Sequence, residues 1–156
     1  MTARSSVVTR QRDVGGKPSL AREAEAEGFL SLGPKSRRAI REGAVEKGDP
    51  LAAGGLAGLL AMKRTAGLLP HCHLVALTNS SVTLTRTGGG VRAVARAEAY
   101  GPTGVEMETL VGVSVALLTV WDMVKYLEKD ARGQYPHTLL GPVRVVRKSK
   151  GGDPPP

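Results

Sequence analysis

Apolar and polar residues alternate in four parts of the chain, and this pattern predicts β-strands. The alternation runs over residues 20–32, 75–87, 91–99 and 138–146. In residues 20–32 alanine alternates with glutamate, and since both residues also favour helices, a helix is the alternative for this segment. Residues 88–90 are glycines that separate the second strand from the third, which indicates an antiparallel hairpin.

Three other segments predict helices. Residues 34–42 begin with proline and are followed by glycine, as is typical of a short helix. A second helix over residues 51–68 has Asp49 as its N-cap and ends before a proline. Residues 105–129 are apolar on most helix faces, so this long helix should be largely buried. Glycines in the second helix lower its helix propensity, and we expect them to allow close packing against a neighbour: Gly54, Gly55 and Gly58.

The order of these elements predicts an α+β fold. The order is strand, helices, strand, strand, helix and strand. This is the order of a ferredoxin-like βαββαβ sandwich with an antiparallel sheet, here with an extra short helix. Pro142 marks an edge strand or a bulge, because proline cannot donate to a strand ladder. We expect one domain over residues 13–148, a flexible N-terminal segment over residues 1–12 and a flexible tail over residues 149–156.

Composition narrows the class of protein. The chain has 156 residues, of which 41 % are hydrophobic and only 3 % aromatic, so valine, leucine and alanine must build the core. A net charge of +8 favours a polyanionic partner, but the scarcity of aromatic rings argues against single-stranded nucleic acid. Cys72 is the only cysteine, which excludes an intrachain disulfide and a site of several thiolates. We expect a cytoplasmic protein without a membrane partner, because the N-terminus lacks an apolar signal core and the longest apolar stretch is shorter than the ~20 residues that span a bilayer.

Polar groups gather in a first segment that contains His71, Cys72 and His73. The pair of histidines suits a metal ligand set, but a zinc site needs more ligands, and His137 is the only other histidine. A polar loop with capping roles is the competing interpretation. We therefore predict no metal and no cofactor.

A second segment, residues 101–108, contains glycines followed by Glu106 and Glu108. Glycines let a backbone approach a ligand closely, and the amides of a helix N-terminus favour anions. Carboxylates in a first helical turn also complement the helix dipole, so a purely structural role competes with a functional one.

The third segment contains Asp122 and Lys125, which are three residues apart on one helix face and can touch. They follow an apolar run, and a charged pair beside buried surface is suited to acid–base chemistry. Glu108 and Asp122 are roughly 21 Å apart at the rise of a single helix. Either one of these groups is structural, or the site is shared between subunits.

These segments together resemble the MoaC family. The resemblance rests on short motifs that occur in the family's order between Asp13 and Lys148: residues 13–18, 22–24, 47–49, 61–65, 69–73, 103–108 and 121–125. The most specific motifs are Thr-Gly-Val-Glu-Met-Glu at residues 103–108 and Trp-Asp-Met-Val-Lys at residues 121–125. The chain departs from the family pattern at His71, Leu74, Trp121 and Val124, in a long segment over residues 131–140, and near Lys148.

The resemblance implies a lyase of molybdenum cofactor biosynthesis, a cyclic pyranopterin monophosphate synthase. Its small-molecule substrate would be 3′,8-cyclo-7,8-dihydro-GTP, and pyrophosphate would be released. The implied assembly is a homo-oligomer, a hexamer built from dimers that share active sites.

By position, the resemblance assigns roles to two sets of residues. The catalytic set is Asp122, Lys125, Lys47, Glu108 and Glu106. The substrate-binding set is His71, Cys72, His73, Met107, Glu108, Lys63, Arg22, Lys17 and Lys148. Two rival interpretations remain: a basic ferredoxin-like RNA-binding module without catalysis, and a homologue that keeps the fold for assembly only.

Overall fold

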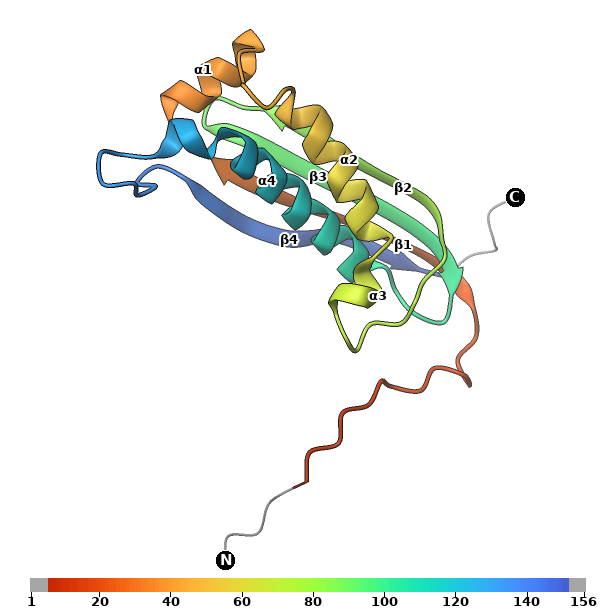
Figure 1. Cartoon of the computed structure of the whole chain (residues 1–156). Helices are drawn as coiled ribbons and strands as arrows, with labels where there is room; N and C mark the ends of the chain where they lie inside the picture. The colour runs from red at the N-terminus through yellow and green to blue at the C-terminus, as the bar shows by residue number, and fades with distance from the viewer. Residues whose placement is uncertain (1–5, 152–156) are drawn as a thin grey trace, which may run out of the picture.

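The computed structural model describes residues 6–151. Along the chain the elements are β1 (Leu20–Ser31), α1 (Pro34–Glu42), α2 (Pro50–Met62), α3 (Thr65–Leu68), β2 (Leu77–Arg86), β3 (Gly90–Gly101), α4 (Glu106–Glu128) and β4 (Leu139–Lys150). The strands form one antiparallel sheet in the order β2-β3-β1-β4. Helices α2 and α4 lie side by side across one face of the sheet (Figure 1). This arrangement confirms the predicted ferredoxin-like α+β sandwich.

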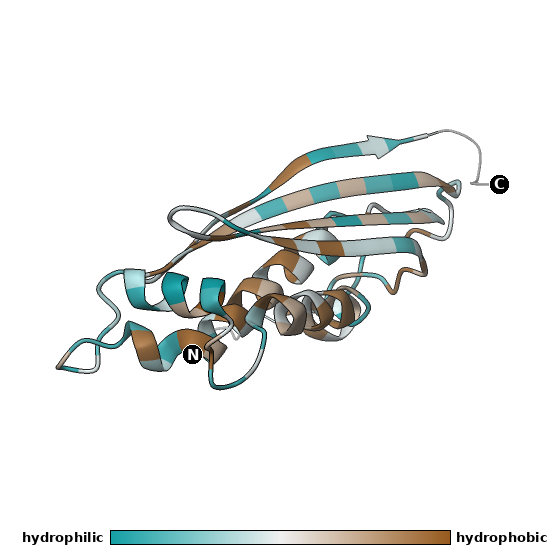
Figure 2. Ribbon diagram, turned by 90° about the horizontal axis from the view of Figure 1, so that it is seen from above, coloured by the Kyte–Doolittle hydropathy of each residue, from teal (hydrophilic) through white to brown (hydrophobic). Residues whose placement is uncertain are grey.

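The structure resolves the choice between strand and helix for β1 in favour of the strand. Ala24 and Ala26 are fully buried under the helices, and their small side chains let α4 approach the sheet. The intervening glutamates lie on the opposite face. There, Glu27 pairs with Arg92 at 2.5 Å and with Arg144 at 2.7 Å, on the two strands that flank β1. The alternation therefore separates an alanine core from a charged outer face, and this appears as stripes along the strands (Figure 2).

Close packing was predicted for all three glycines of α2, and the structure confirms it for two of them, which contact α4. A Cβ on Gly58 would lie 2.7 Å from the backbone oxygen of Gly112, and one on Gly54 would lie 2.9 Å from the backbone oxygen of Ala116. A Cβ on Gly55 would meet nothing closer than 3.7 Å. Backbone contact between α2 and α4 thus depends on Gly54 and Gly58.

The single helix predicted over residues 51–68 was wrong, because α2 ends at Met62 and α3 begins at Thr65. The buried hydroxyl of Thr65 donates to the backbone oxygen of Met62 at 3.0 Å. This hydroxyl takes a carbonyl that a continuous helix would have bonded to a backbone amide. Strand β4 is longer than the predicted 138–146, since it pairs with β1 as far as Lys150. Pro142 lies in β4, which is an edge strand as its proline indicated.

Helix α4 forms the centre of the core. Its 23 residues are long and apolar enough, by length and composition alone, to cross a membrane. In this fold its fully buried residues face the sheet and α2, as expected for the long helix: Val113, Ala116, Leu117, Val120 and Val124. The core is built from alanine, valine and leucine with a few methionines, which confirms the prediction from composition. The polar side chains at the two ends of α4 supply the candidate site.

Candidate active site

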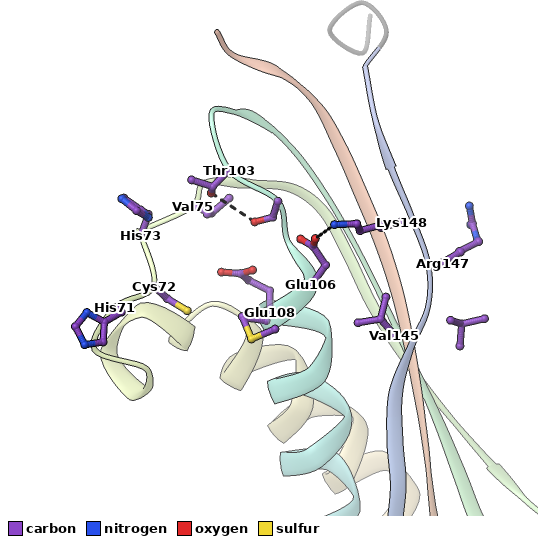
Figure 3. Close-up of a pocket in the computed structure, with 13 residues that line it drawn as sticks. His71, Cys72, His73, Val75, Thr103, Glu106, Glu108, Val145, Arg147 and Lys148 are labelled. Atoms are coloured by element: carbon purple, nitrogen blue, oxygen red, sulfur yellow. Dashed lines mark hydrogen bonds and ion pairs between the residues drawn. The ribbon is translucent and has the colours of Figure 1, made fainter. Parts of the chain in front are cut away.

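A cavity of 690 Å³ lies beside the N-terminus of α4 (Figure 3). Three parts of the chain form its wall, namely the loop of residues 71–75, the turn and first helical residues 103–108, and residues 145–148 of β4. The cavity therefore brings together two of the three segments that the sequence singled out. Apolar walls with a few convergent polar groups are typical of a small-molecule site.

Arg22 of β1 supports the turn that leads into α4. Its guanidinium donates to the backbone oxygen of Gly101 at 3.1 Å and to that of Pro102 at 3.0 Å. These bonds hold the end of β3 against β1 and fix the direction in which the following helix starts. Arg22 is not a lining residue of the cavity, but its charge acts on Glu106 inside it.

The two carboxylates in the first turn of α4 lie in different surroundings. Glu108 points toward the loop that carries Cys72 and His73, whereas Glu106 points toward Lys148 of β4 (Figure 3). Glu106 accepts a hydrogen bond from the Nζ of Lys148 at 2.7 Å. Glu108 is almost completely buried, and no cation is paired with it among residues 6–151.

This difference sets the pKa values of the two groups apart. Burial, reinforced by the charge of Glu106, raises the pKa of Glu108 above its ordinary value. Partial burial also opposes ionisation of Glu106, but the Lys148 hydrogen bond, a backbone bond and the charges of Lys148 and Arg22 outweigh it, so the pKa of Glu106 is lowered. A pair of carboxyl groups with opposed shifts can act as proton donor and fixed negative charge.

Cys72 lies in the same cavity, half-buried and free. Burial, together with the charge of Glu108, raises the pKa of its thiol. A thiol that resists ionisation is a poor nucleophile. Cys72 therefore contributes packing and a weak polar contact to the wall.

The histidine loop is held by the N-terminal segment. The Nδ1 of His71 lies 2.9 Å from the backbone oxygen of Arg10, and the Nε2 of His73 lies 2.6 Å from that of Arg12. Gln11 donates from its side chain to the backbone oxygen of Cys72 at 2.6 Å. Because a carbonyl only accepts, each of these ring nitrogens must carry a proton. Residues 1–5 lie outside the described residues, so the predicted flexibility of residues 1–12 stays a prediction.

A second polar cluster lies further along α4. Asp122 pairs with Lys125 at 2.7 Å and with Lys47, from the loop after α1, at 2.9 Å. Hydrogen bonds from Lys125 and then Lys47 lower the pKa of Asp122 to about 2, and Asp122 in turn raises the pKa of Lys125. All three side chains are about half exposed, so the cluster faces solvent in the single chain.

None of Lys47, Asp122 and Lys125 lines the cavity with Glu106 and Glu108, and the two clusters lie at different parts of α4. This agrees with the separation predicted from the sequence. Lys17 and Lys63 are exposed and line neither cluster. Met107 is 41 % exposed at the mouth of the cavity, where it is free to contact a ligand.

Some lining residues were not identified from the sequence. Arg147 follows the strand alternation of β4 and pairs with Glu23 on the outer face, so its sequence position gave no signal of a site. Thr103 and Gly104 belong to the recognised glycine-containing segment, which was the available signal for them. Among residues 6–151, no group of three His, Cys, Asp or Glu side chains is arranged to hold a metal ion.

Comparison with known proteins gives a consistent result. A relative from Methanoregula boonei is 49 % identical over 139 residues, which cover 89 % of this chain and 90 % of the relative. A relative from Pyrococcus abyssi is 48 % identical over 88 % of this chain and 87 % of its own length. A relative from Saccharolobus solfataricus is 43 % identical over 90 % of this chain and 95 % of its own length. All three carry the name "Probable cyclic pyranopterin monophosphate synthase".

The family comparison covers nearly all of the described structure. The model of the MoaC family matches residues 11–151, a span that includes both polar clusters, the histidine loop, and Gln11 and Arg12, which bond to that loop. With a ferredoxin-like fold and close relatives over most of its length, the chain belongs to the MoaC family of enzymes.

Proposed function

We propose that this chain is a cyclic pyranopterin monophosphate synthase of molybdenum cofactor biosynthesis. It converts 3′,8-cyclo-7,8-dihydro-GTP to cyclic pyranopterin monophosphate and releases pyrophosphate, in the cytoplasm and without a resident cofactor. The names of relatives 43–49 % identical over most of the chain support the reaction. The observation that carries the proposal is the cavity at the N-terminus of α4, with two carboxyl groups whose pKa values are shifted in opposite directions.

In this proposal Glu108 moves protons. Its raised pKa keeps a larger protonated fraction near neutral pH, as a general acid requires. Asp122 is suited to a different task, because a pKa of about 2 keeps it ionised and bound to two lysines. Lys47 and Lys125 stabilise the anionic charge that develops when the ring is rearranged and the phosphate is displaced.

The substrate's triphosphate requires cations near the cavity. Lys148 lies in the wall, and Arg22 lies directly behind the turn. Lysine suits a flexible triphosphate because it acts as a compact point charge with rotatable donors. Lys17 and Lys63 are further candidates for this role, and the loop of residues 71–73 with Met107 contacts the ring system.

One chain alone does not complete the site. Glu108 and Asp122 belong to the same helix, 14 residues apart in the sequence, which is about 21 Å of helix. A single small molecule cannot bridge that length and still contact both groups closely. In our proposal two copies meet so that the glutamate cavity of one faces the Lys47–Asp122–Lys125 cluster of the other, within a hexamer of dimers.

The test is an assay with the purified full chain and the cyclic GTP derivative, in which pyrophosphate and the pterin product are measured. Asp122→Ala should lower pyrophosphate release at least ~100-fold, since it removes the anion that holds both lysines. The oligomer should stay intact, because ion pairs between half-exposed side chains contribute little to stability. Glu42→Ala is the matched control, as it removes an exposed carboxylate with an arginine partner outside both clusters.

Near-normal turnover of Asp122→Ala would remove this residue from the mechanism. No turnover by the unaltered chain, together with salt-sensitive RNA binding, would favour the alternative function of a basic RNA-binding module.

A further inference from the structure

We propose a second ligand site, distinct from the candidate active site, in which three arginines bind the phosphoryl group of a small phosphorylated molecule. The site is a cavity of 320 Å³ between α1 and the hairpin that joins β2 to β3. Its cationic wall is formed by Arg37, Arg41 and Arg86. It shares no lining residue with the cavity beside α4.

Two elements bring these arginines together. Arg37 and Arg41 are four residues apart on α1, so their side chains lie on one face of the helix. Arg86 ends β2 and donates to the backbone oxygen of Arg41 at 3.4 Å. The remaining wall consists of apolar residues and turn backbone, and it contains no carboxylate: Ile40, Thr87, Gly88, Gly90 and Val91.

The positive charge of this cavity is poorly compensated within residues 6–151. The Nε of Arg37 is buried and lacks a hydrogen-bond partner. Arg41 has only a long contact of 3.7 Å with Glu42, and Glu42 is already paired with Arg38 at 2.9 Å. Like charges at this helical spacing destabilise a helix. A bound anion would offset that cost, which points to a ligand in addition to the structural bonds that Arg37 and Arg86 make.

The cavity is also held in place before any ligand arrives. A nitrogen of the Arg37 guanidinium donates to the backbone oxygen of Gly88 in the hairpin turn. The hydroxyl of Thr87 accepts from the backbone nitrogens of Gly89 at 3.3 Å and Gly90 at 3.1 Å, which fixes the turn itself. A preorganised arginine loses less side-chain entropy when a ligand binds, so affinity rises.

A neighbouring cavity of 420 Å³ extends the site toward the start of α2 and is lined by the same Arg41 and Arg86. Asp49 is the acidic residue there, but its carboxylate accepts from the backbone nitrogens of Leu51 and Ala52 at the helix N-terminus. Both bonds use the same carboxylate oxygen of Asp49, so this single carboxylate is fixed at the helix cap and offsets only part of the charge of the three arginines. The two adjoining spaces leave room for a nucleotide-sized molecule with its phosphate against the arginines.

The chemistry of the wall selects the ligand class. Guanidinium groups present paired N–H donors that match two oxygens of one phosphate, and three of them suit a multiply charged phosphoryl group. Lysine would supply charge without this geometry. The predicted ligands are therefore pyrophosphate and phosphorylated nucleotides rather than chloride or a monocarboxylate.

Calorimetric titration of the full chain with pyrophosphate at 0.15 M salt tests the inference. We expect Arg41→Ala/Arg86→Ala to lose one bound pyrophosphate per chain, or to bind it at least ~10-fold more weakly, while synthase turnover stays normal. Arg41→Lys/Arg86→Lys should fall between the double alanine variant and the unaltered chain. Lys35→Ala/Lys129→Ala is the matched control because it also removes two charges, from exposed positions that do not line either cavity of the site. This variant should bind pyrophosphate as the unaltered chain does.

GTP and a short RNA serve as further probes in the same experiment. Binding of pyrophosphate and GTP with the same dependence on Arg41 and Arg86 supports the site. The site would be overturned by equal weakening in Lys35→Ala/Lys129→Ala, by an unchanged binding stoichiometry in all variants, or by binding of RNA alone. Thermal melts show whether the double alanine variant has lost its fold. If it has, the binding measured for Arg41→Lys/Arg86→Lys decides the test. The outcome is independent of the proposed reaction, because it is measured as binding.

Discussion

At the scale of single residues, the candidate site depends on how two neighbouring glutamates differ. Glu106 and Glu108 are two positions apart, and both lie in the first turn of α4. One is bound to Lys148, and the other is buried without a cation among the described residues. From sequence position alone, both could either complement the helix dipole or act in catalysis. Their surroundings distinguish them, because the pKa of Glu106 is lowered and the pKa of Glu108 is raised.

Glu108→Gln should reduce synthase turnover at least ~100-fold, because glutamine cannot transfer a proton. The same variant should be more stable than the unaltered chain at pH 7. For an acid whose pKa is higher in the folded state, stability falls as pH rises from the unfolded value, 4.5, through the folded pKa. Glutamine removes this penalty, so the gain in melting temperature should shrink as pH falls toward 4.5.

Glu106→Gln is the matched control for this stability measurement. The pKa of Glu106 is lowered in the folded state, so its contribution is present above the unfolded value and is lost as pH falls through the folded pKa. This variant should therefore melt at a lower temperature than the unaltered chain at pH 7. A lower melting temperature for Glu108→Gln at pH 7 would contradict the assignment of a buried, hard-to-ionise acid.

At the scale of elements, the close contact of α2 with α4 positions everything that α4 carries. The alanine-rich face of β1 and β3 lets α4 sit close to the sheet, and glycines let α2 sit close to α4. The start of α4 is fixed by Arg22 and the turn before it. A change at the helix contact should therefore reduce stability and displace the carboxylates together.

Gly58→Ala should lower the free energy of unfolding by about 1–3 kcal/mol, because the added methyl meets the backbone of Gly112 at 2.7 Å and neither helix can yield easily. Gly55→Ala is its control on the same helix. There the nearest atom is 3.7 Å away, and the better helix propensity of alanine should raise stability by up to about 1 kcal/mol. Denaturant unfolding of both variants measures the difference. Equal effects of the two substitutions would show that helix propensity, rather than packing, controls α2.

At the scale of the whole molecule, Glu108 and Asp122 of the two polar clusters lie about 21 Å apart along α4. The cluster of Lys47, Asp122 and Lys125 faces solvent, and the cavity with Glu108 opens elsewhere. The shared site that we propose accounts for a solvent-facing lysine–aspartate cluster and a separate glutamate cavity in one small enzyme.

Mixed oligomers test this arrangement. Lys125→Ala subunits and Glu108→Ala subunits should each be inactive alone, and together they should recover part of the turnover, because some interfaces then contain one intact site. About a quarter of the native activity is the upper bound for random mixing into dimers with two sites each, on the additive reasoning for independent sites. Confirmed mixed dimers without any recovery would count against sharing. Mixing two Glu108→Ala preparations gives the background.

The pattern of the chain by itself determined the order of the elements and most of their types, since a period of two for strands and apolar helix faces are properties of local sequence. It left the choice between strand and helix open for residues 20–32, because alanine and glutamate also favour helices. Composition determined that the core is poor in aromatic residues. The constant rise of a helix determined the separation of Glu108 from Asp122. The motifs around residues 103–108 and 121–125 were sufficient to recognise the family.

Tertiary structure decided the rest, because burial and pairing depend on residues far away in the sequence. It divided the predicted helix of residues 51–68 at Thr65 and shifted the pKa values of Glu106 and Glu108 in opposite directions. It also brought Arg147 into the cavity wall and Gln11 to the histidine loop. It also joined Arg86 of β2 to the arginines of α1. Apart from the bond of Thr65 to Met62, which is three residues away, these contacts join parts of the chain that only the folded sheet and helices bring together.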